Sequence, residues 1–228
     1  GMAGLAAALA LKRVGITNVR IFDKAPAGVE GPWLTYARME VLRSPPDLTG
    51  PALGFPSLTF RAWFEAQFGG EAWGRLHRIS RTQWMDYLNW YRRMVDAAIE
   101  NDCEMIAIDG GDGYVVLTLK SAAGVRKVAA RRVILANGRD GLGGAYVPPL
   151  FRSLPTSVCA HSSDDIDFVR LKGRTVAVVG GGASAVDNAA ETLEHGAAHV
   201  AMLVRRPDVP RVNRGMGIGS AGMWHGFY

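Results

Sequence analysis

The most informative pattern of apolar and small residues lies between residues 176 and 204. Residues 176–179 form a short apolar run, and residues 180–185 follow as a glycine turn of the form G-x-G-x-x-A. An alanine-rich segment comes next, and a second apolar run occupies residues 198–204. This order predicts a strand, a turn, a helix and a second strand, the arrangement that binds the pyrophosphate of a dinucleotide at a helix N-terminus.

The residue types within this turn support the same prediction. Gly180 permits a tight turn, Gly182 lets the backbone approach a phosphate, and the small Ala185 lets the helix and strand pack closely. Ser184 stands where its hydroxyl can donate to a phosphate at the start of the helix. We therefore expect these four residues to contact or shape the nucleotide site.

An arginine pair, Arg205 and Arg206, follows the second apolar run. An acidic residue at this position would hold the ribose 2′-hydroxyl of NAD, whereas arginine suits the 2′-phosphate of NADP. The pair therefore predicts NADP as the nucleotide of this site.

The N-terminal residues look like the second half of another nucleotide motif. Gly1 and Gly4 have the spacing of the last two glycines of G-x-G-x-x-G, and an apolar, alanine-rich segment follows them. A β-branched run at 18–22 then ends in Asp23 and Lys24, about where an acidic residue holds a ribose diol. The alternative is that Gly1 precedes an ordinary amphipathic helix, but the spacing of helix, strand and acid favours the nucleotide motif.

Together the two patterns predict an α/β fold with two Rossmann-like domains, each a three-layer, doubly wound parallel sheet. The domains are expected at 1–152 and 153–228. The first lacks its opening strand and first glycine, and the second is incomplete at its C-terminal end, so the chain reads as a fragment. Because the opening strand of such a sheet is central and buried on both faces, we expect the fragment to bind its first dinucleotide poorly.

The residues between the two motifs predict a loop, two helices and three strands. Frequent Pro, Gly, Ser and Thr at 31–60 indicate an irregular loop. An aromatic stripe predicts a helix capped by Thr82 and running through Val95, with an apolar face that is more often core than cofactor platform. The other expected elements are a helix at 59–68 capped by Ser57 or Thr59, strands at 103–108 and 114–119, and a buried strand at 131–138.

Composition narrows the function classes. The chain has 228 residues, 48% hydrophobic and 21% charged, which is typical of a soluble globular protein. No apolar stretch reaches about 18 residues, so no transmembrane helix is expected, and no basic region marks a signal peptide. The basic residues behind the net charge of +5 are scattered without a nucleic-acid motif. Histidine and cysteine spacing predicts no metal site.

Cysteine usage points to a reducing compartment. Cys103 and Cys159 are far apart and form no C-x-x-C motif. This argues for a cytoplasmic protein and against a dithiol-disulfide reductase.

With these elements placed, the chain resembles the two-dinucleotide flavoproteins, and within them the class B flavin-dependent monooxygenases, over nearly its whole length. It is most similar to the branch that N-hydroxylates the side-chain amines of lysine or ornithine. The segments that carry the resemblance are Gly1–Gly4, Asp23-Lys24, Gly31-Pro32-Trp33, Arg81–Trp90 (R-x-E-F-x-D-Y-L-x-W in that branch), Ala136-Asn137-Gly138 (Ala-Thr-Gly in such flavoproteins), His161-Ser162-Ser163 and Gly180–Ala185 (G-G-G-x-S-A).

The resemblance implies FAD at 1–152, NADPH at 153–228, and transfer of one atom of dioxygen through a flavin C4a-hydroperoxide to a small nucleophilic substrate. It implies cofactor contacts by Gly1, Gly4, Asp23, Lys24, Trp33, Gln83, Gly138, Gly180, Gly182, Ser184, Ala185, Arg205 and Arg206. Asp47 is the expected catalytic polar group beside the flavin. For three residues a structural role stays open: Asp47 as a turn cap, Gln83 as a polar residue at a helix start, and His161 as a hydrogen-bonding group between the domains.

Two departures leave the substrate open. Of the F-x-G-x-x-x-H-x-x-x-W signature of Baeyer–Villiger enzymes only His161 is present, and loop 42–51 is shorter and richer in proline than its counterpart in amine hydroxylases. Two other functions also stay open: an NAD(P)H-dependent flavin reductase that inserts no oxygen, and a non-catalytic nucleotide-binding or redox module. The partners expected are a small-molecule substrate and dioxygen, with no nucleic acid and no membrane, and a homo-oligomer is left open.

Overall fold

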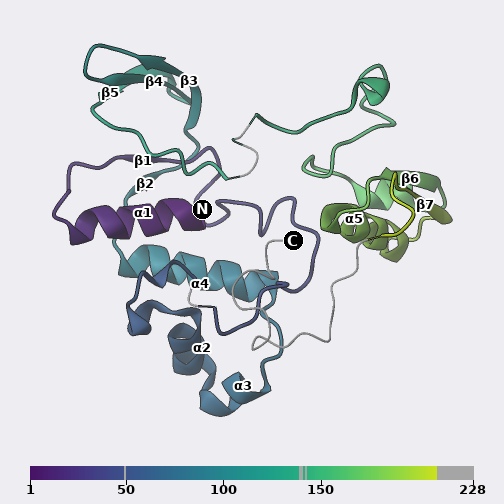
Figure 1. Ribbon diagram of the computed structural model, residues 1–228, viewed down its shortest axis with the longest axis horizontal. Coiled ribbons are helices and arrows are strands. Elements are labelled where there is room, and N and C mark those ends of the chain that lie inside the picture. Colours follow the sequence, from purple (N-terminus) through teal and green to yellow (C-terminus); the bar gives the residue numbers. More distant parts are fainter. Residues whose placement is uncertain (49, 139–140, 142, 210–228) are drawn as a thin grey trace. The chain divides into compact units, whose positions relative to one another are not determined.

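The computed structural model describes residues 1–48, 50–138, 141 and 143–209. The chain divides into two compact units. Unit 1 contains Gly1–Thr35 and Glu40–Tyr146, and unit 2 contains Tyr36–Met39 and the residues from Val147 onward. The two units are described separately below, and Figure 1 labels their helices and strands.

Four helices form the helical part of unit 1: α1 (Met2–Arg13), α2 (Phe60–Phe68), α3 (Gly70–Arg75) and α4 (Arg81–Met94). The Thr59 hydroxyl accepts a hydrogen bond from the Ala62 amide, so α2 begins where the sequence predicts. Helix α4 begins at a capping box made by Ser80 and Gln83, two residues before the expected cap Thr82. Helix α3 was not predicted, and two short 3₁₀ turns lie in the loop before α2, at Gly50–Ala52 and Pro56–Leu58.

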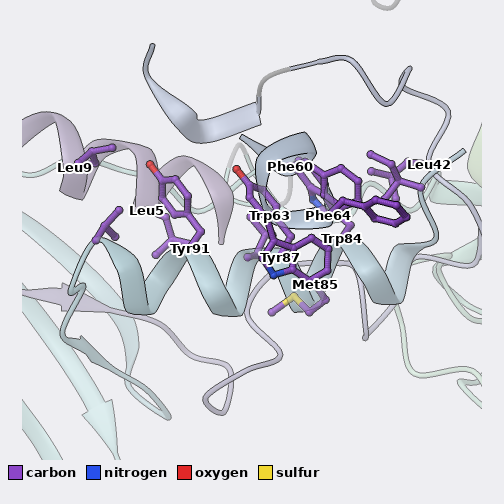
Figure 2. Close-up of a cluster of buried hydrophobic side chains, with 13 residues drawn as sticks. Leu5, Leu9, Leu42, Phe60, Trp63, Phe64, Trp84, Met85, Tyr87 and Tyr91 are labelled. Atoms are coloured by element: carbon purple, nitrogen blue, oxygen red, sulfur yellow. The ribbon is translucent and has the colours of Figure 1, made fainter. Parts of the chain in front are cut away.

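The aromatic stripe of α4 lies in the main hydrophobic core, as the sequence analysis favoured. Tyr87, Tyr91 and Phe60 are fully buried, and Figure 2 shows α4 side chains packed against those of α1 and α2. The Tyr87 hydroxyl donates to the Leu58 carbonyl at 2.7 Å, and the Tyr91 hydroxyl donates to the Pro51 carbonyl at 2.6 Å. Burial raises the pKa of both phenols, so both stay neutral and serve as donors.

Two small sheets complete unit 1. Strands β1 (Ile21–Phe22) and β2 (Ile99–Glu100) pair in parallel. Strands β3 (Glu104–Gly110), β4 (Val115–Ser121) and β5 (Gly124–Ala130) form an antiparallel meander. A second, smaller core of Cys103, Leu117 and Leu119 lies beneath the meander.

The strands of unit 1 differ in part from those expected. The predictions at 103–108 and 114–119 are confirmed as β3 and β4, whereas β2 and β5 were not foreseen and the strand at 18–22 shortens to β1. The predicted buried strand at 131–138 is wrong, since this segment has no strand conformation, and Ile134 and Leu135 are 57% and 58% exposed. A parallel strand needs a hydrogen-bonded neighbour, and no strand in the described part of the chain pairs with this segment.

Unit 2 contains the strand-turn-helix-strand element that the apolar pattern predicts. Strand β6 (Thr175–Val179) leads through the glycine turn into helix α5 (Ala183–Glu194), and strand β7 (His199–Leu203) returns in parallel beside β6. Two 3₁₀ turns, Pro149–Phe151 and Phe168–Leu171, precede it. Parallel strands joined through a helix are the building block of the Rossmann-type α/β fold, so the predicted fold class is confirmed.

None of the helices in the described part of the chain has the length and apolar character that a membrane span requires.

Candidate dinucleotide-binding sites

The N-terminus of α5 is an open cradle of backbone groups. Gly180 has φ +134°, which L-residues with a side chain rarely adopt. Gly182 is the N-cap of the 12-residue helix, with an extended backbone and no side-chain cap. A Cβ built at Gly182 would meet no heavy atom within 4 Å, so the space beside this backbone is free. The uncapped amides of the first turn, with the exposed Ser184 among them, fit the pyrophosphate of a dinucleotide.

Small residues are also required inside this turn. A Cβ at Gly180 would lie 3.4 Å from the Cβ of Ala185, already in van der Waals contact, so the turn and the helix leave little room for a bulkier side chain at either position. A Cβ at Gly181 would lie 2.6 Å from Cγ1 of Val204, which is closer than real contacts allow. The sequence analysis assigned no role to Gly181, although the run of three glycines at this point was the signal for it.

The arginine pair follows at the same edge of the sheet. Val179 is in register with Leu203, and the Gly180 amide donates to the Leu203 carbonyl at 3.0 Å. Because β6 and β7 are parallel, the glycine turn and the residues after β7 leave from the same end of the two strands. Arg205 and Arg206 are both exposed there. This placement fits two cations near the ribose of a nucleotide whose pyrophosphate lies on α5.

A second cluster surrounds the N-terminus of α1 in unit 1. Gly1 is the N-cap of α1, without a side-chain cap. One carboxylate oxygen of the half-buried Asp23 lies 3.3 Å from the terminal ammonium of Gly1, and the other accepts from the Ala25 amide at 3.0 Å. Gly31 approaches from another loop, since a Cβ built at Gly1 would lie 3.8 Å from the Gly31 Cα. Glycine backbones, a helix N-terminus and one acidic side chain are thus brought together from distant parts of the sequence.

Gly4 and Trp33 lie at the borders of this cluster. A Cβ at Gly4 would lie 3.6 Å from the Cβ of Ala136, so the segment before Gly138 passes over the first turn of α1. The half-buried Trp33 ring meets Trp84 edge to face, with ring centroids 6.2 Å apart. Gly138 is exposed and has φ +68°, and Lys24 is also exposed.

The remaining candidate residues take part in local structure. Asp47 is exposed in a turn closed by the bond from the Leu48 amide to the Pro45 carbonyl. The Gln83 side chain accepts from the Ser80 amide at 3.4 Å, within the capping box of α4. In unit 2, Nδ1 of His161 lies 2.7 Å from the Ser163 hydroxyl and accepts from the Ser163 amide at 3.2 Å. The Gln83 contact agrees with the structural role left open for it, whereas the turn at Asp47 and the His161–Ser163 contacts are local and do not test the roles left open for those two residues.

The two cysteines are both free thiols. Cys103 is buried, and this burial raises its pKa, so its thiol stays protonated and unreactive. Cys159 is half-buried in unit 2. The described residues contain no group of three or more His, Cys, Asp or Glu side chains that could hold a metal ion.

Comparison with known families identifies the chain. The family model for pyridine nucleotide-disulphide oxidoreductases matches residues 1–215. The chain belongs to this family. It is 44% identical over 214 residues to the FAD-dependent urate hydroxylase of Xanthomonas campestris pv. campestris, which covers 93% of this chain and 45% of that protein. The chain thus spans less than half the length of this curated relative.

Solved structures show the same fold. The ornithine N-hydroxylase of Kutzneria sp. 744, solved with reduced FAD, NADP⁺ and L-ornithine, has a TM-score of 0.64 and 20% identity, covering 90% of this chain and 51% of that one. The bacillithiol disulfide reductase of Staphylococcus aureus has a TM-score of 0.67 and 21% identity, covering 92% and 56%. The resemblance to two-dinucleotide flavoproteins is therefore confirmed for family and fold. Oxygenases and a reductase share this fold, so the fold alone does not define the reaction.

Proposed function

We propose that the protein containing this chain is an FAD-dependent, NADPH-using monooxygenase. The pair of dinucleotide cradles, one followed by an acidic residue and the other by two arginines, carries the assignment of FAD and NADPH. The 44% identity to an FAD-dependent urate hydroxylase supports the proposal and suggests urate, a small planar heterocycle, as the substrate. In this proposal residues 1–152 bind FAD and residues 153–228 bind NADPH.

Each cradle has a defined task. On α5, the backbone amides after Gly182 and the Ser184 hydroxyl donate to the pyrophosphate, and Arg205 and Arg206 bind the 2′-phosphate that distinguishes NADPH from NADH. On α1, the Asp23 carboxylate accepts hydrogen bonds from a ribose diol, and Gly1 and the nearby backbone leave room for phosphate.

The bound cofactors supply the redox chemistry, with hydride from NADPH and activation of dioxygen by FAD. The chain itself contributes binding and orientation, which agrees with the lack of an acid–base triad among the candidate residues. Asp47 keeps its proposed place as a polar group near the flavin, together with Trp33, Lys24 and Gly138 as cofactor contacts, whereas Gln83 is proposed to serve the capping box of α4. A cytoplasmic location remains part of the proposal, and the oligomeric state stays open.

The test is oxygen uptake by the full-length protein supplied with FAD, NADPH and one of three substrates: urate, L-ornithine or L-lysine. The proposal predicts that urate stimulates consumption of dioxygen and NADPH in a ratio of one to one, and that one ¹⁸O atom from ¹⁸O₂ enters the product. Oxidation of NADPH without labelled product would instead identify a flavin reductase. A protein that binds nucleotides but oxidises no NADPH would be a binding module.

A further inference from the structure

A buried ionic network lies directly beside the α1 cradle. Glu30 is only 5% exposed. Among the residues that the structure describes, it is the one charged residue that is buried. Arg92 on α4 pairs with it, and the Arg92 side chain is 22% exposed. Burial of a carboxylate is costly unless the charge is paired and hydrogen-bonded. The position of Glu30 therefore needs an explanation beyond general stability.

Every oxygen of the Glu30 carboxylate has a partner. One oxygen accepts from the Arg92 guanidinium and from the Asn101 side-chain amide, the latter at 2.8 Å. The other oxygen accepts from the Gly28 backbone amide at 2.9 Å. The Glu30 carboxylate thus links loop 24–31 by hydrogen bonds to Arg92 on α4 and to Asn101, which directly follows β2.

Further hydrogen bonds of Arg92 and Asn101, and one of Asn89, extend the network. Arg92 also donates to the Asn101 side-chain oxygen at 3.1 Å. Asn101 donates in turn to the Ala25 carbonyl at 3.0 Å, and Asn89 on α4 donates to the Gly28 carbonyl at 3.3 Å. Loop 24–31 is therefore held at both Ala25 and Gly28 by side chains from outside the loop.

The two ends of this loop are the points that reach α1. Asp23 precedes the loop and pairs with the terminal ammonium of Gly1, while Gly31 ends the loop and approaches the Gly1 backbone. Gly1, Glu30 and Arg92 also line the same small pocket. A shift of loop 24–31 would therefore move both the acidic residue and the close backbone approach of the α1 cradle.

We propose that Glu30, Arg92 and Asn101 are positioning residues for FAD, which fix loop 24–31 so that Asp23 and Gly31 meet the cofactor at α1. The proposal rests on the assignment of FAD to this cradle. In this proposal the Glu30 carboxylate does not contact FAD. It influences FAD binding by fixing the position of loop 24–31. Precise binding sites generally require that the residues contacting the ligand are held in place by hydrogen bonds from residues behind them.

The test uses the full-length protein and measures three quantities for each variant: FAD affinity by quenching of flavin fluorescence, NADP⁺ affinity by calorimetry, and the melting temperature of the apoprotein. Glu30→Gln keeps the size of the side chain but removes the charge opposite Arg92. We expect FAD to bind about tenfold more weakly, with NADP⁺ affinity within about twofold of wild type, because NADP⁺ binds in unit 2. The matched control Glu65→Gln breaks an exposed pair with Arg61 on α2 and should change neither affinity.

Arg92→Lys retains the charge but cannot reach Glu30, Asn101 and the Ile99 carbonyl at once, so it should also weaken FAD binding. The double variant Glu30→Gln/Arg92→Gln removes the unpaired charge and should recover the melting temperature but not the FAD affinity. Recovery of both would assign the network to stability alone. If Glu30→Gln yields no soluble protein, Asn89→Ala, which leaves the ion pair intact, should still weaken FAD binding about threefold.

The results separate the two proposals. A wild-type protein that binds no FAD would contradict the proposed function. A wild-type protein that binds FAD, with Glu30→Gln and Asn89→Ala binding it equally well, would overturn the positioning role and leave the proposed function intact.

Discussion

The two helix N-termini that form the candidate sites are built in different ways. At α5 the strand, the glycine turn, the helix and the arginine pair follow one another within 32 residues, from Thr175 to Arg206. At α1 the cradle depends on segments far apart in sequence, with Asp23, Gly31 and Ala136 converging on the first turn. One site is local, and the other is assembled by the tertiary fold.

This difference determines which substitutions should disrupt nucleotide binding at each site. The α5 cradle depends on the absence of side chains at Gly180, where φ is +134°, and at Gly181, where a Cβ would lie 2.6 Å from Val204, so a single substitution in the turn can disrupt it. The α1 cradle depends on loops that α4 and β2 hold in place through Glu30, Arg92 and Asn101. Its failure can therefore begin at residues that touch no nucleotide.

The largest effect is expected for Gly180→Val. The positive φ and the 3.4 Å approach to Ala185 leave no place for a branched side chain, so NADP⁺ affinity should fall more than about 100-fold. Calorimetry with NADP⁺ measures this, and FAD affinity should stay unchanged. Gly196→Ala is the control, since Gly196 also has a positive φ, +85°, but lies at the other end of α5. Equal loss of NADP⁺ affinity in both variants would show that strain in unit 2, and not the turn, is responsible.

A somewhat smaller effect is expected at the other site for Asp23→Asn. Loss of the charged acceptor for a ribose diol should weaken FAD binding about tenfold to 100-fold, as for hydrogen bonds to charged groups. Fluorescence titration with FAD measures this, and NADP⁺ affinity should not change. Asp96→Asn, which removes an exposed partner of Lys12, serves as the control. If Asp23→Asn binds FAD normally, the acid does not hold the ribose.

The double variant Arg205→Ala/Arg206→Ala sharpens the assignment of the nucleotide. It should raise the KM for NADPH about tenfold, because two charge-assisted contacts to a phosphate are lost, and leave the KM for NADH nearly unchanged. Steady-state kinetics with both nucleotides gives the ratio, with Arg170→Ala in the same unit as the control. An equal effect on both nucleotides would reject a role at the 2′-phosphate.

The smallest effect is expected at the capping box of α4. Ser80→Ala and Gln83→Leu should each lower the free energy of unfolding by about 1 kcal/mol, as loss of an N-cap does. Denaturant unfolding measures this change, and FAD affinity should stay within about twofold of wild type. A large loss of FAD affinity in Gln83→Leu alone would return Gln83 to the cofactor site.

The sequence was sufficient for the elements whose signals are local. The glycine turn defined β6, α5 and β7, and the aromatic stripe at 82–95 defined both α4 and its buried face. Of the two caps that the sequence offered for α2, Ser57 and Thr59, the structure uses Thr59. In each case the pattern and the structure depend on residues a few positions apart.

Long-range pairing explains what the sequence could not supply. Segment 131–138 has a short apolar run at 133–136 that is typical of a buried strand, yet the segment has no paired neighbour in the described residues. Strand β5 contains the adjacent charged residues Arg126 and Lys127, and it forms by pairing along its whole length with β4. The Glu30–Arg92–Asn101 network joins residues up to 71 positions apart, so no local sequence motif could predict it.

The most direct test of two separate cradles is a crystal structure of the full-length protein with FAD and NADP⁺ bound. The account predicts the FAD pyrophosphate at the N-terminus of α1, with a ribose on Asp23. It predicts the NADP⁺ pyrophosphate over Gly180–Ser184, with the 2′-phosphate against Arg205 and Arg206. FAD bound on α5, or both nucleotides sharing one helix N-terminus, would contradict the account.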